Sequence, residues 1–377
     1  MGLLWSVVPD NASAKKLAIL SKLDSTIHHW NYKFDICDGE KRGTTSKTDY
    51  ALDSRVVKRL FLAPNVEISS IKCGSAEGTL YLPRQEVVSG PLPFIIDMPG
   101  MAPRNVKDRP VLLSSHGFAV FDFHYFNSVK EDIERDHTTA CFNMGLFYDI
   151  IEFVKSHPRL DEARIGINGA CFGGTLALHT LSRLSDLPIR CMVLQRCVDT
   201  LVGLGLQNPD GSVAVKTEVV SDYSTAREGE DGRKWSNFEF DHPIFDEDAC
   251  DKIIPQAENI SCPLLLIVCG DDQQCPSEKC LTRVANRLRK AGKGHLLSIT
   301  HLPGAGHLLL SPFLPLCTQS RLYMPDFTEV TYVNWGGERT VHCKAQETAW
   351  RKSINFFRHH LGPMKMLRHD WIDGDQM

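Results

Sequence analysis

The sequence lacks a dominant charge, a membrane-length apolar run, an internal repeat and a low-complexity tract. Its 377 residues carry a formal net charge of −4, which gives no electropositive footprint for nucleic acid. The longest apolar run, Cys262 to Cys269, is far shorter than the ~20 residues that cross a bilayer. No basic segment leading into an apolar one opens the chain. We therefore expect no nucleic-acid partner and no membrane span.

Motifs for disulfides and metals are also absent. The thirteen cysteines are odd in number and irregularly spaced, which favours free thiols in a reducing compartment. There is no Cys-x-x-Cys pair and no His-Glu-x-x-His helix, so we expect neither a metal nor a cofactor. The chain ends in Gly374-Asp375-Gln376-Met377 and not in a Ser-Lys-Leu-type address. The cytoplasm is therefore the expected location, with the peroxisome as the alternative.

What the sequence does contain is a regular alternation of strand and helix patterns from Pro91 onward, which predicts an α/β fold with a mainly parallel sheet. The repeat of Phe147, Ile150, Ile151 and Val154 marks one amphipathic helix. A second helix is expected around Val106 to Ser115 and a third along Trp350 to Leu361. The expected strands are Phe94 to Met98, Phe118 to Phe123, Ile189 to Leu194, Cys262 to Val268 and His295 to Thr300.

Two stretches depart from this alternation. Residues 1–90 carry short β-rich pieces and turns, which predict a small separate β unit. Residues 91–377 then form the catalytic domain. Residues 200–260 show little periodicity, and we interpret them as an insertion over the carboxyl edge of the sheet, placed to cover a substrate. A plain surface excursion is the alternative.

The most informative segment is Arg164 to Thr175, where an apolar strand runs into Gly-Ala-Cys-Phe-Gly-Gly and then into a helix-forming stretch. Small residues around a nucleophile are typical of a nucleophile elbow, because the sharp strand-to-helix turn leaves no room for bulky neighbours. Cys171 would lie at the helix N-terminus, where free amide groups and the helix dipole stabilise a thiolate. The competing interpretation is a buried core cysteine.

A cysteine nucleophile needs a base and an orienting acid, and both follow it in the order expected of α/β-hydrolases. Asp272 is the preferred acid over Asp271, because it lies further past the end of its strand. His307 is the preferred base, since it follows the last strand within a glycine-rich loop. His116, His301 and His342 are the weaker candidates.

An oxyanion of a tetrahedral intermediate needs two amide donors. We expect the first to be the backbone N–H of Phe172, directly after the nucleophile. The second should come from the loop after the first strand, at Gly100 or Met101.

Beyond these residues, the chain resembles, nearly end to end, the acyl-CoA thioesterase and bile acid-CoA:amino acid N-acyltransferase family of α/β-hydrolases. The most specific matches are Trp335-Gly336-Gly337-Glu338 and Lys344-Ala345-Gln346-Glu347. The others are Met1 to Trp5, Gly78 to Pro83, Ile95 to Gly100, Leu264 to Val268 with Asp271-Asp272, and Pro303 to His307. The resemblance implies an N-terminal β-sandwich, which would here lack its opening strands, and a triad of Cys171, Asp272 and His307.

The resemblance also implies the chemistry. We expect cleavage of an acyl-CoA through an acyl-Cys171 intermediate, with CoA as part of the substrate and not a cofactor. The acyl group then passes to water, or to an amino acid such as glycine or taurine, within fatty acid or lipid metabolism. Thioesterase members typically carry serine at the elbow and the transferases cysteine. The sequence sets no oligomeric state.

Two other functions stay open. A hydrolase of small esters or lactones is favoured by the Cys-x-Gly-Gly turn, which resembles that of dienelactone hydrolases. A binding protein or an inactive fragment is favoured by the expected loss of the opening strands.

Overall fold

The computed structural model describes most of the chain from residue 65 onward. The described residues are 65–100, 108–129, 140–201, 203–216, 224–230, 234–238, 240–241, 243–246, 253, 255–311, 317–322 and 331–366. Of the β-sandwich predicted for residues 1–90, the part that covers residues 1–64 lies outside them.

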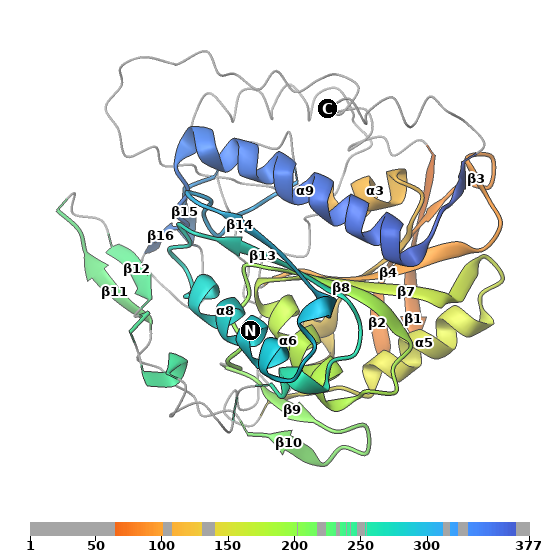
Figure 1. Cartoon of the computed structure of the whole chain (residues 1–377), viewed down its shortest axis with the longest axis horizontal. Helices are drawn as coiled ribbons and strands as arrows, with labels where there is room; N and C mark the ends of the chain where they lie inside the picture. Colours follow the sequence, from red (N-terminus) through yellow and green to blue (C-terminus); the bar gives the residue numbers. More distant parts are fainter. Residues whose placement is uncertain are drawn as a thin grey trace.

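The core of the molecule is an eight-stranded sheet in the order β1-β2-β5-β4-β7-β8-β13-β14 (Figure 1). From β5 to β14 neighbouring strands are parallel, whereas β2 runs antiparallel to both β1 and β5. This order, with one reversed strand near an edge, is the α/β-hydrolase arrangement that the sequence predicts. The strands are β1 (Val66–Cys73), β2 (Ala76–Pro83), β4 (Leu92–Met98), β5 (Ala119–Phe123), β7 (Leu160–Ala170), β8 (Ile189–Gln195), β13 (Leu264–Cys269) and β14 (Leu297–Leu302).

The first two strands do not belong to a separate β unit. Strands β1 and β2 form a hairpin, and β2 continues into the central sheet by pairing Gly78 with Phe123 and Tyr81 with Val120. The predicted boundary at residue 90 therefore falls inside the sheet for this part of the chain. A hairpin has the same local pattern in a sandwich and in a mixed sheet. Only the long-range pairing with β5 distinguishes the two.

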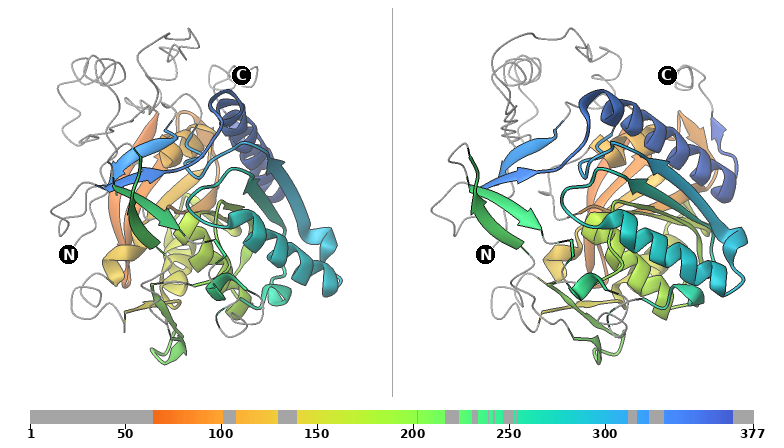
Figure 2. Two further views of the ribbon diagram at one scale, coloured as in Figure 1. Left: turned by 90° about the vertical axis from the view of Figure 1, so that its left-hand side faces the viewer. Right: turned by 60° about the vertical axis from the view of Figure 1, so that its left-hand side comes forward.

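Helices cover both faces of the sheet (Figures 1 and 2). Helices α3 (Asp108–Ser115) and α9 (Arg339–Leu361) lie on one face, and α5 (Leu146–Ser156), α6 (Cys171–Arg183) and α8 (Ser277–Lys290) lie on the other. The predicted apolar stripe of α5 is buried, as expected for an amphipathic helix against a sheet. Helix α9 extends well before the predicted Trp350 and begins at Arg339.

Smaller elements lie beside the central sheet. Strands β6 (Cys141–Asn143), β9 (Gly205–Gln207) and β10 (Val213–Val215) form one small sheet, and β11 (Ser224–Glu228), β12 (Lys234–Phe238), β15 (Gln319–Leu322) and β16 (Thr331–Asn334) form another. Strands β3 (Val88–Ser89) and β17 (Lys365–Met366) pair with each other. Four 3₁₀ turns complete the described elements: η1 (Tyr125–Ser128), η3 (Pro243–Phe245), η4 (Ala257–Asn259) and η5 (Gly294–Leu296). The stretch predicted as an insertion thus adds no strand to the central sheet in its described part. A helix with the length and apolarity to cross a bilayer is not found in the described ranges.

The carboxyl ends of the parallel strands meet at one edge of the sheet, so the loops that follow them are neighbours. Strand β7 is followed by Cys171, β13 by Asp272 and β14 by His307. The sheet therefore brings together three residues that are up to 136 positions apart in the sequence.

The segment after β8 is held firmly at the same edge. The Arg283 guanidinium of α8 makes two hydrogen bonds of 2.6 Å to the carboxylate of Asp199, which is fully buried. The Nε2–H of His179 donates to the Asp199 carbonyl at 2.7 Å, and the Thr175 hydroxyl donates to the Val198 carbonyl at 2.7 Å. Helices α6 and α8 thus fix the backbone directly beyond β8.

Arg283→Ala is expected to destabilise the protein by roughly 3–5 kcal/mol, because it leaves the Asp199 carboxylate buried without its guanidinium. The matched control Arg287→Ala removes a partly exposed pair with Glu258 from the same helix and should cost less than about 1 kcal/mol. Urea unfolding followed by circular dichroism measures both. Equal losses in the two variants would contradict this account of how the segment is held.

Candidate active site

The turn between β7 and α6 has the geometry of a nucleophile elbow. Cys171 has a φ of 51°, a left-handed conformation that few non-glycine residues adopt, and α6 begins at this residue. A side chain at Gly169 would lie 2.6 Å from the Cα of Gly174, and one at Gly173 would collide with the backbone carbonyls of β4 and its following loop. The small residues around Cys171 are therefore required by the packing of the turn.

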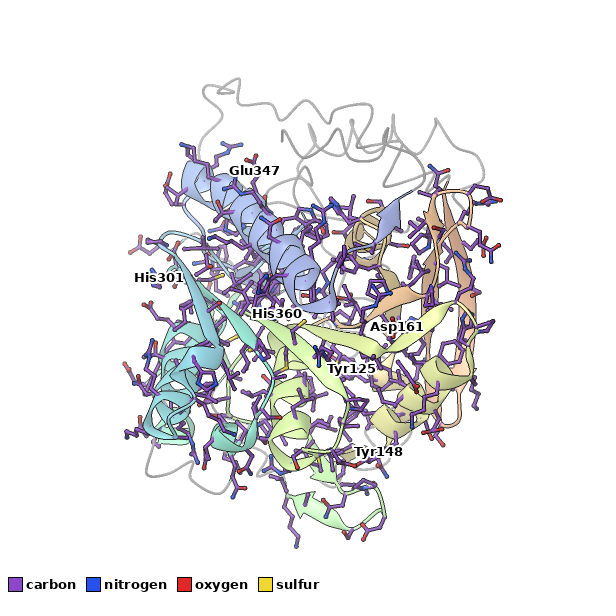
Figure 3. The ribbon with its side chains drawn as sticks, turned by 45° about the vertical axis from the view of Figure 1, so that its right-hand side comes forward. Tyr125, Tyr148, Asp161, His301, Glu347 and His360 are labelled. Atoms are coloured by element: carbon purple, nitrogen blue, oxygen red, sulfur yellow. The ribbon has the colours of Figure 1, made fainter. Side chains whose placement is uncertain are left out.

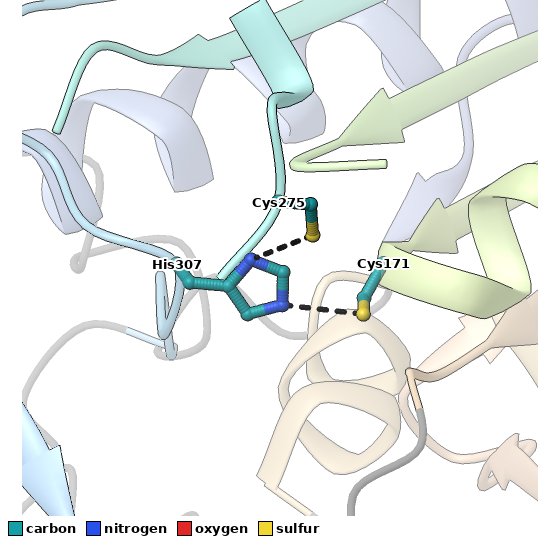
Figure 4. Close-up of side chains that lie close together, drawn as sticks. All are labelled: Cys171, Cys275 and His307. Atoms are coloured by element: carbon teal, nitrogen blue, oxygen red, sulfur yellow. Dashed lines mark hydrogen bonds between the residues drawn. The ribbon is translucent and has the colours of Figure 1, made fainter. Parts of the chain in front are cut away.

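The Cys171 thiol, the His307 ring and the Asp272 carboxylate form one hydrogen-bonded chain. The Nε2 atom of His307 lies 3.2 Å from the Cys171 Sγ (Figure 4). On the other side of the ring, Nδ1–H donates to the two carboxylate oxygens of Asp272 at 3.0 and 2.9 Å. His307 and Asp272 are buried. The structure thus brings together all three side chains that the sequence proposes as nucleophile, base and acid.

The two neighbouring aspartates have different partners. Asp272 receives three further hydrogen bonds, from the backbone N–H groups of Gln274 and Cys275 and from the Ser277 hydroxyl. These donors fix the carboxylate facing His307. Asp271 instead accepts from the Gly337 N–H at 2.7 Å. The geometry therefore favours the predicted choice of Asp272 over Asp271.

The loop that carries His307 is clamped by its neighbours. The Trp335 carbonyl accepts from the His307 N–H at 2.7 Å, and the indole stacks on the imidazole with the ring centroids 5.8 Å apart. His342 bonds to both sides of this residue: its Nδ1 accepts from the Gly306 N–H, and its Nε2–H donates to the Leu308 carbonyl. Both ring nitrogens of His342 are thus engaged with the backbone. His342 positions His307 and is not a rival for the role of the base.

The other two candidate histidines lie elsewhere. His301 is exposed on β14 and pairs with Glu278 at 2.8 Å. Figure 3 shows it at the outer edge of the molecule, far from Tyr125, whose hydroxyl donates to the Pro99 carbonyl beside the elbow. His116 packs near Trp350 under α9.

Cys275 is a member of the site that sequence reasoning missed. Its Sγ lies 3.5 Å from the His307 Nδ1. One ligand atom each from Cys171, Cys275 and His307 lies within 4.8 Å of the others, and two thiols with an imidazole are ligands that suit zinc. No local motif indicates this group, because its members come from three separate loops. Only the position of Cys275 soon after Asp272 could have suggested it.

The electrostatics favour an ion pair between Cys171 and His307. The hydrogen bond from the Cys275 thiol, and then the charge of His307, hold the pKa of Cys171 well below its usual range despite burial. Burial lowers the pKa of His307, but the Asp272 carboxylate and the Cys171 thiolate outweigh it and raise the pKa to about 9. The interaction with the neighbouring Cys171 sulfur, and then burial, raise the pKa of Cys275, so that this thiol keeps its proton.

The predicted oxyanion donors flank the nucleophile. Phe172 is the second residue of α6, and the amides of a first helical turn have no acceptor within the helix. Gly100 packs directly against Cys171, because a Cβ built on it would lie 2.7 Å from the Cys171 Cβ and 3.3 Å from its Sγ. Met101 lies outside the described residues.

Cys275→Ala is expected to raise the pKa of Cys171, because the thiolate loses its hydrogen-bond donor. The rate of Cys171 alkylation by iodoacetamide, followed by peptide mass spectrometry with a chelator present, should fall about tenfold at pH 6 and little at pH 9.

Cys275→Ser is the matched control, since its hydroxyl can still donate to Cys171. It should keep most of the reactivity at pH 6. Identical pH profiles for Cys275→Ala and the wild type would show that Cys275 does not stabilise the thiolate.

The chain is similar in sequence to enzymes that act on acyl-CoA thioesters. The chain is 28% identical over 362 residues to acyl-coenzyme A thioesterase 1 of Mus musculus, with 96% of this chain and 79% of the relative covered. It is 28% identical over 374 residues to bile acid-CoA:amino acid N-acyltransferase of Mus musculus, with 96% and 81% covered. The solved structure of a dienelactone hydrolase-like promiscuous phosphotriesterase from metagenomic libraries aligns at 16% identity and a TM-score of 0.44, covering 78% of this chain and 98% of its own. That score supports no functional conclusion.

A family model described as BAAT / acyl-CoA thioester hydrolase C terminal matches residues 142–363. The matched stretch makes up more than half of the chain, and Cys171, Asp272 and His307 all lie within it. The protein therefore belongs to the BAAT / acyl-CoA thioester hydrolase C-terminal family.

Proposed function

We propose that the protein is an enzyme that cleaves an acyl-CoA thioester through an acyl-Cys171 intermediate. The observation that carries the proposal is the hydrogen-bonded chain from Cys171 through His307 to Asp272, built on an elbow at the edge of the sheet. The names of the relatives, which include thioesterases and an N-acyltransferase, support the substrate class.

In the first step the Cys171 thiolate attacks the thioester carbonyl. The oxyanion that forms is stabilised by amide donors, for which the Phe172 N–H and the backbone at Gly100 are the candidates. The carbonyl then re-forms, the bond to the CoA sulfur breaks, and His307 passes its Nε2 proton to that sulfur. One thioester replaces another, so the step needs little driving force and no cofactor.

In the second step His307 acts as a base. Acylation removes the Cys171 thiolate, which is one of the charges that raise the pKa of His307, so the ring is more easily kept neutral. Asp272 continues to hold Nδ1–H, which leaves Nε2 free to take a proton from the acceptor. Water as the acceptor gives a free acid, and an amine gives an amide. A cytoplasmic setting stays a prediction from the sequence.

Mixing the protein with a long-chain acyl-CoA and quenching in acid should give an acyl adduct on Cys171, detected by intact and peptide mass spectrometry. Cys171→Ala should give no adduct and should lower CoA release by at least about 10³-fold, the usual loss on removing a covalent nucleophile. Cys275→Ala, which removes the neighbouring thiol, should still form the adduct.

Turnover by a protein that stays unmodified, or an adduct on Cys275, would refute the role given to Cys171. A small lactone hydrolysed much faster than any acyl-CoA would favour the lactone or ester hydrolase instead. No turnover with either substrate class by a folded protein would favour a binding protein.

A further inference from the structure

Cys275 is a nucleophilic side chain in the site that takes no part in the proposed acylation or transfer steps. Those steps need a nucleophile, a base and an orienting acid, which Cys171, His307 and Asp272 supply. The Cys275 Sγ nevertheless lies within 4.8 Å of the Cys171 Sγ and 3.5 Å from the His307 Nδ1. Two sulfur atoms at this separation can react with each other.

The two cysteines come from separate loops at the same edge of the sheet. Cys171 follows β7 and begins α6, and Cys275 lies between β13 and α8. Figure 4 shows both thiols directed toward the His307 ring. A disulfide requires the two sulfurs to approach to about 2.05 Å. Rotation about χ1 moves each Sγ without moving the backbone, so the sulfurs can approach by side-chain rotation.

The two sulfurs differ in reactivity in the way that a disulfide-forming pair requires. The hydrogen bond from Cys275, and then the charge of His307, hold the pKa of Cys171 well below its usual range despite burial. The interaction with Cys171, and then burial, raise the pKa of Cys275. A peroxide oxidises a thiolate first, and an adjacent thiol then traps the sulfenic acid as a disulfide. Both cysteines are partly exposed, so a small peroxide can reach them.

Cys197 is a third sulfur near the elbow and is less suited to this role. It is fully buried, and burial raises its pKa above the usual range. It packs against α6, where a Cβ built on Gly174 would lie 3.2 Å from its Sγ. Within the described part of the chain, Cys275 is therefore the thiol placed to react with an oxidised Cys171, and Cys197 provides a matched control.

We propose that Cys171 and Cys275 form a reversible disulfide when a hydroperoxide oxidises Cys171. The bond switches the enzyme off until a thiol reduces it, because it takes up the sulfur that attacks the thioester. It also protects Cys171 from irreversible oxidation to the sulfinic and sulfonic acids. The inference goes beyond the proposed function, and it rests on that function only where CoA release is the readout.

The oxidation proceeds in two balanced steps. The Cys171 thiolate attacks the terminal oxygen of the hydroperoxide, the oxygen–oxygen bond breaks, and the sulfur becomes a sulfenic acid. The departing oxygen takes the Nε2 proton of His307, so the hydroperoxide is reduced to an alcohol, or hydrogen peroxide to water. The Cys275 sulfur then displaces hydroxide from the Cys171 sulfur, and the Cys275 proton leaves with that hydroxide as water. A dithiol reverses the reaction by two thiol–disulfide exchanges and is itself oxidised.

The test treats the full chain with hydrogen peroxide and then with dithiothreitol, with a chelator present so that no metal occupies the site. CoA release from an acyl-CoA is measured at each stage, relative to the untreated sample of the same variant. Peptide mapping without reduction locates any disulfide. In the wild type, activity should fall at least about tenfold and nearly all of it should return on reduction. The oxidised sample should contain linked peptides that carry Cys171 and Cys275.

Cys275→Ser keeps a hydroxyl beside Cys171 but cannot form the disulfide. Its Cys171 should proceed to the sulfinic acid, so that reduction restores less than about a tenth of the variant's own starting activity. Cys197→Ala removes the other nearby sulfur and should recover as the wild type does. Because each value is a ratio within one variant, differences in starting activity cancel.

A wild type that keeps its activity in peroxide, or loses it without a bond between Cys171 and Cys275, would overturn the proposal while leaving acyl-Cys171 intact. Equal recovery in Cys275→Ser and the wild type would do the same. A bond from Cys171 to Cys197, or between two molecules, would reject the role given to Cys275. Reversible formation of the bond between Cys171 and Cys275 by a protein that releases no CoA before oxidation would support the disulfide and reject the proposed function.

Discussion

The site depends on a thiolate at Cys171, at the end of β7, held beside a protonated His307 ring. Most of the surrounding structure stabilises one or the other of these two charges. The helix that starts at Cys171, the thiol of Cys275 and the charge of His307 stabilise the thiolate. The carboxylate of Asp272 stabilises the imidazolium and is itself fixed by three donors from its own loop. The pair therefore depends on loops from three strands meeting at one sheet edge.

The position of the His307 ring is set by two glycine-containing loops, one around Gly306 and one around Gly336, which pack on each other. A side chain on Gly306 would collide with the backbone of Gly336, and one on Gly336 would collide with the backbone carbonyl of Asp271. Trp335 and His342 then bond to the backbone on both sides of the His307 ring, and Asp271 holds the Gly337 amide. The motif Trp335 to Glu338, far from the triad in sequence, thus has a physical role in setting where the imidazole lies.

Most strands of the sheet and the residues of the triad could be predicted from the sequence, because the patterns that indicate them are local. Buried strands such as β13 show as continuous apolar runs, and the elbow shows as small residues around one cysteine. The remainder depends on long-range pairing. The place of β1 and β2 in the central sheet follows from the register with β5, which no local pattern encodes. Cys275 looks like an ordinary loop residue until the sheet brings the loop after β13 to Cys171.

The central claim is that Cys171 and His307 form a thiolate–imidazolium pair at neutral pH, and ¹⁵N NMR of the histidine-labelled protein tests it directly. The account predicts that at pH 7 both ring nitrogens of His307 carry protons, that one is lost as the pH rises through about 9, and that Cys171→Ala lowers this pKa. A wild-type His307 that is already neutral at pH 7, with a proton on one nitrogen alone, would contradict the account.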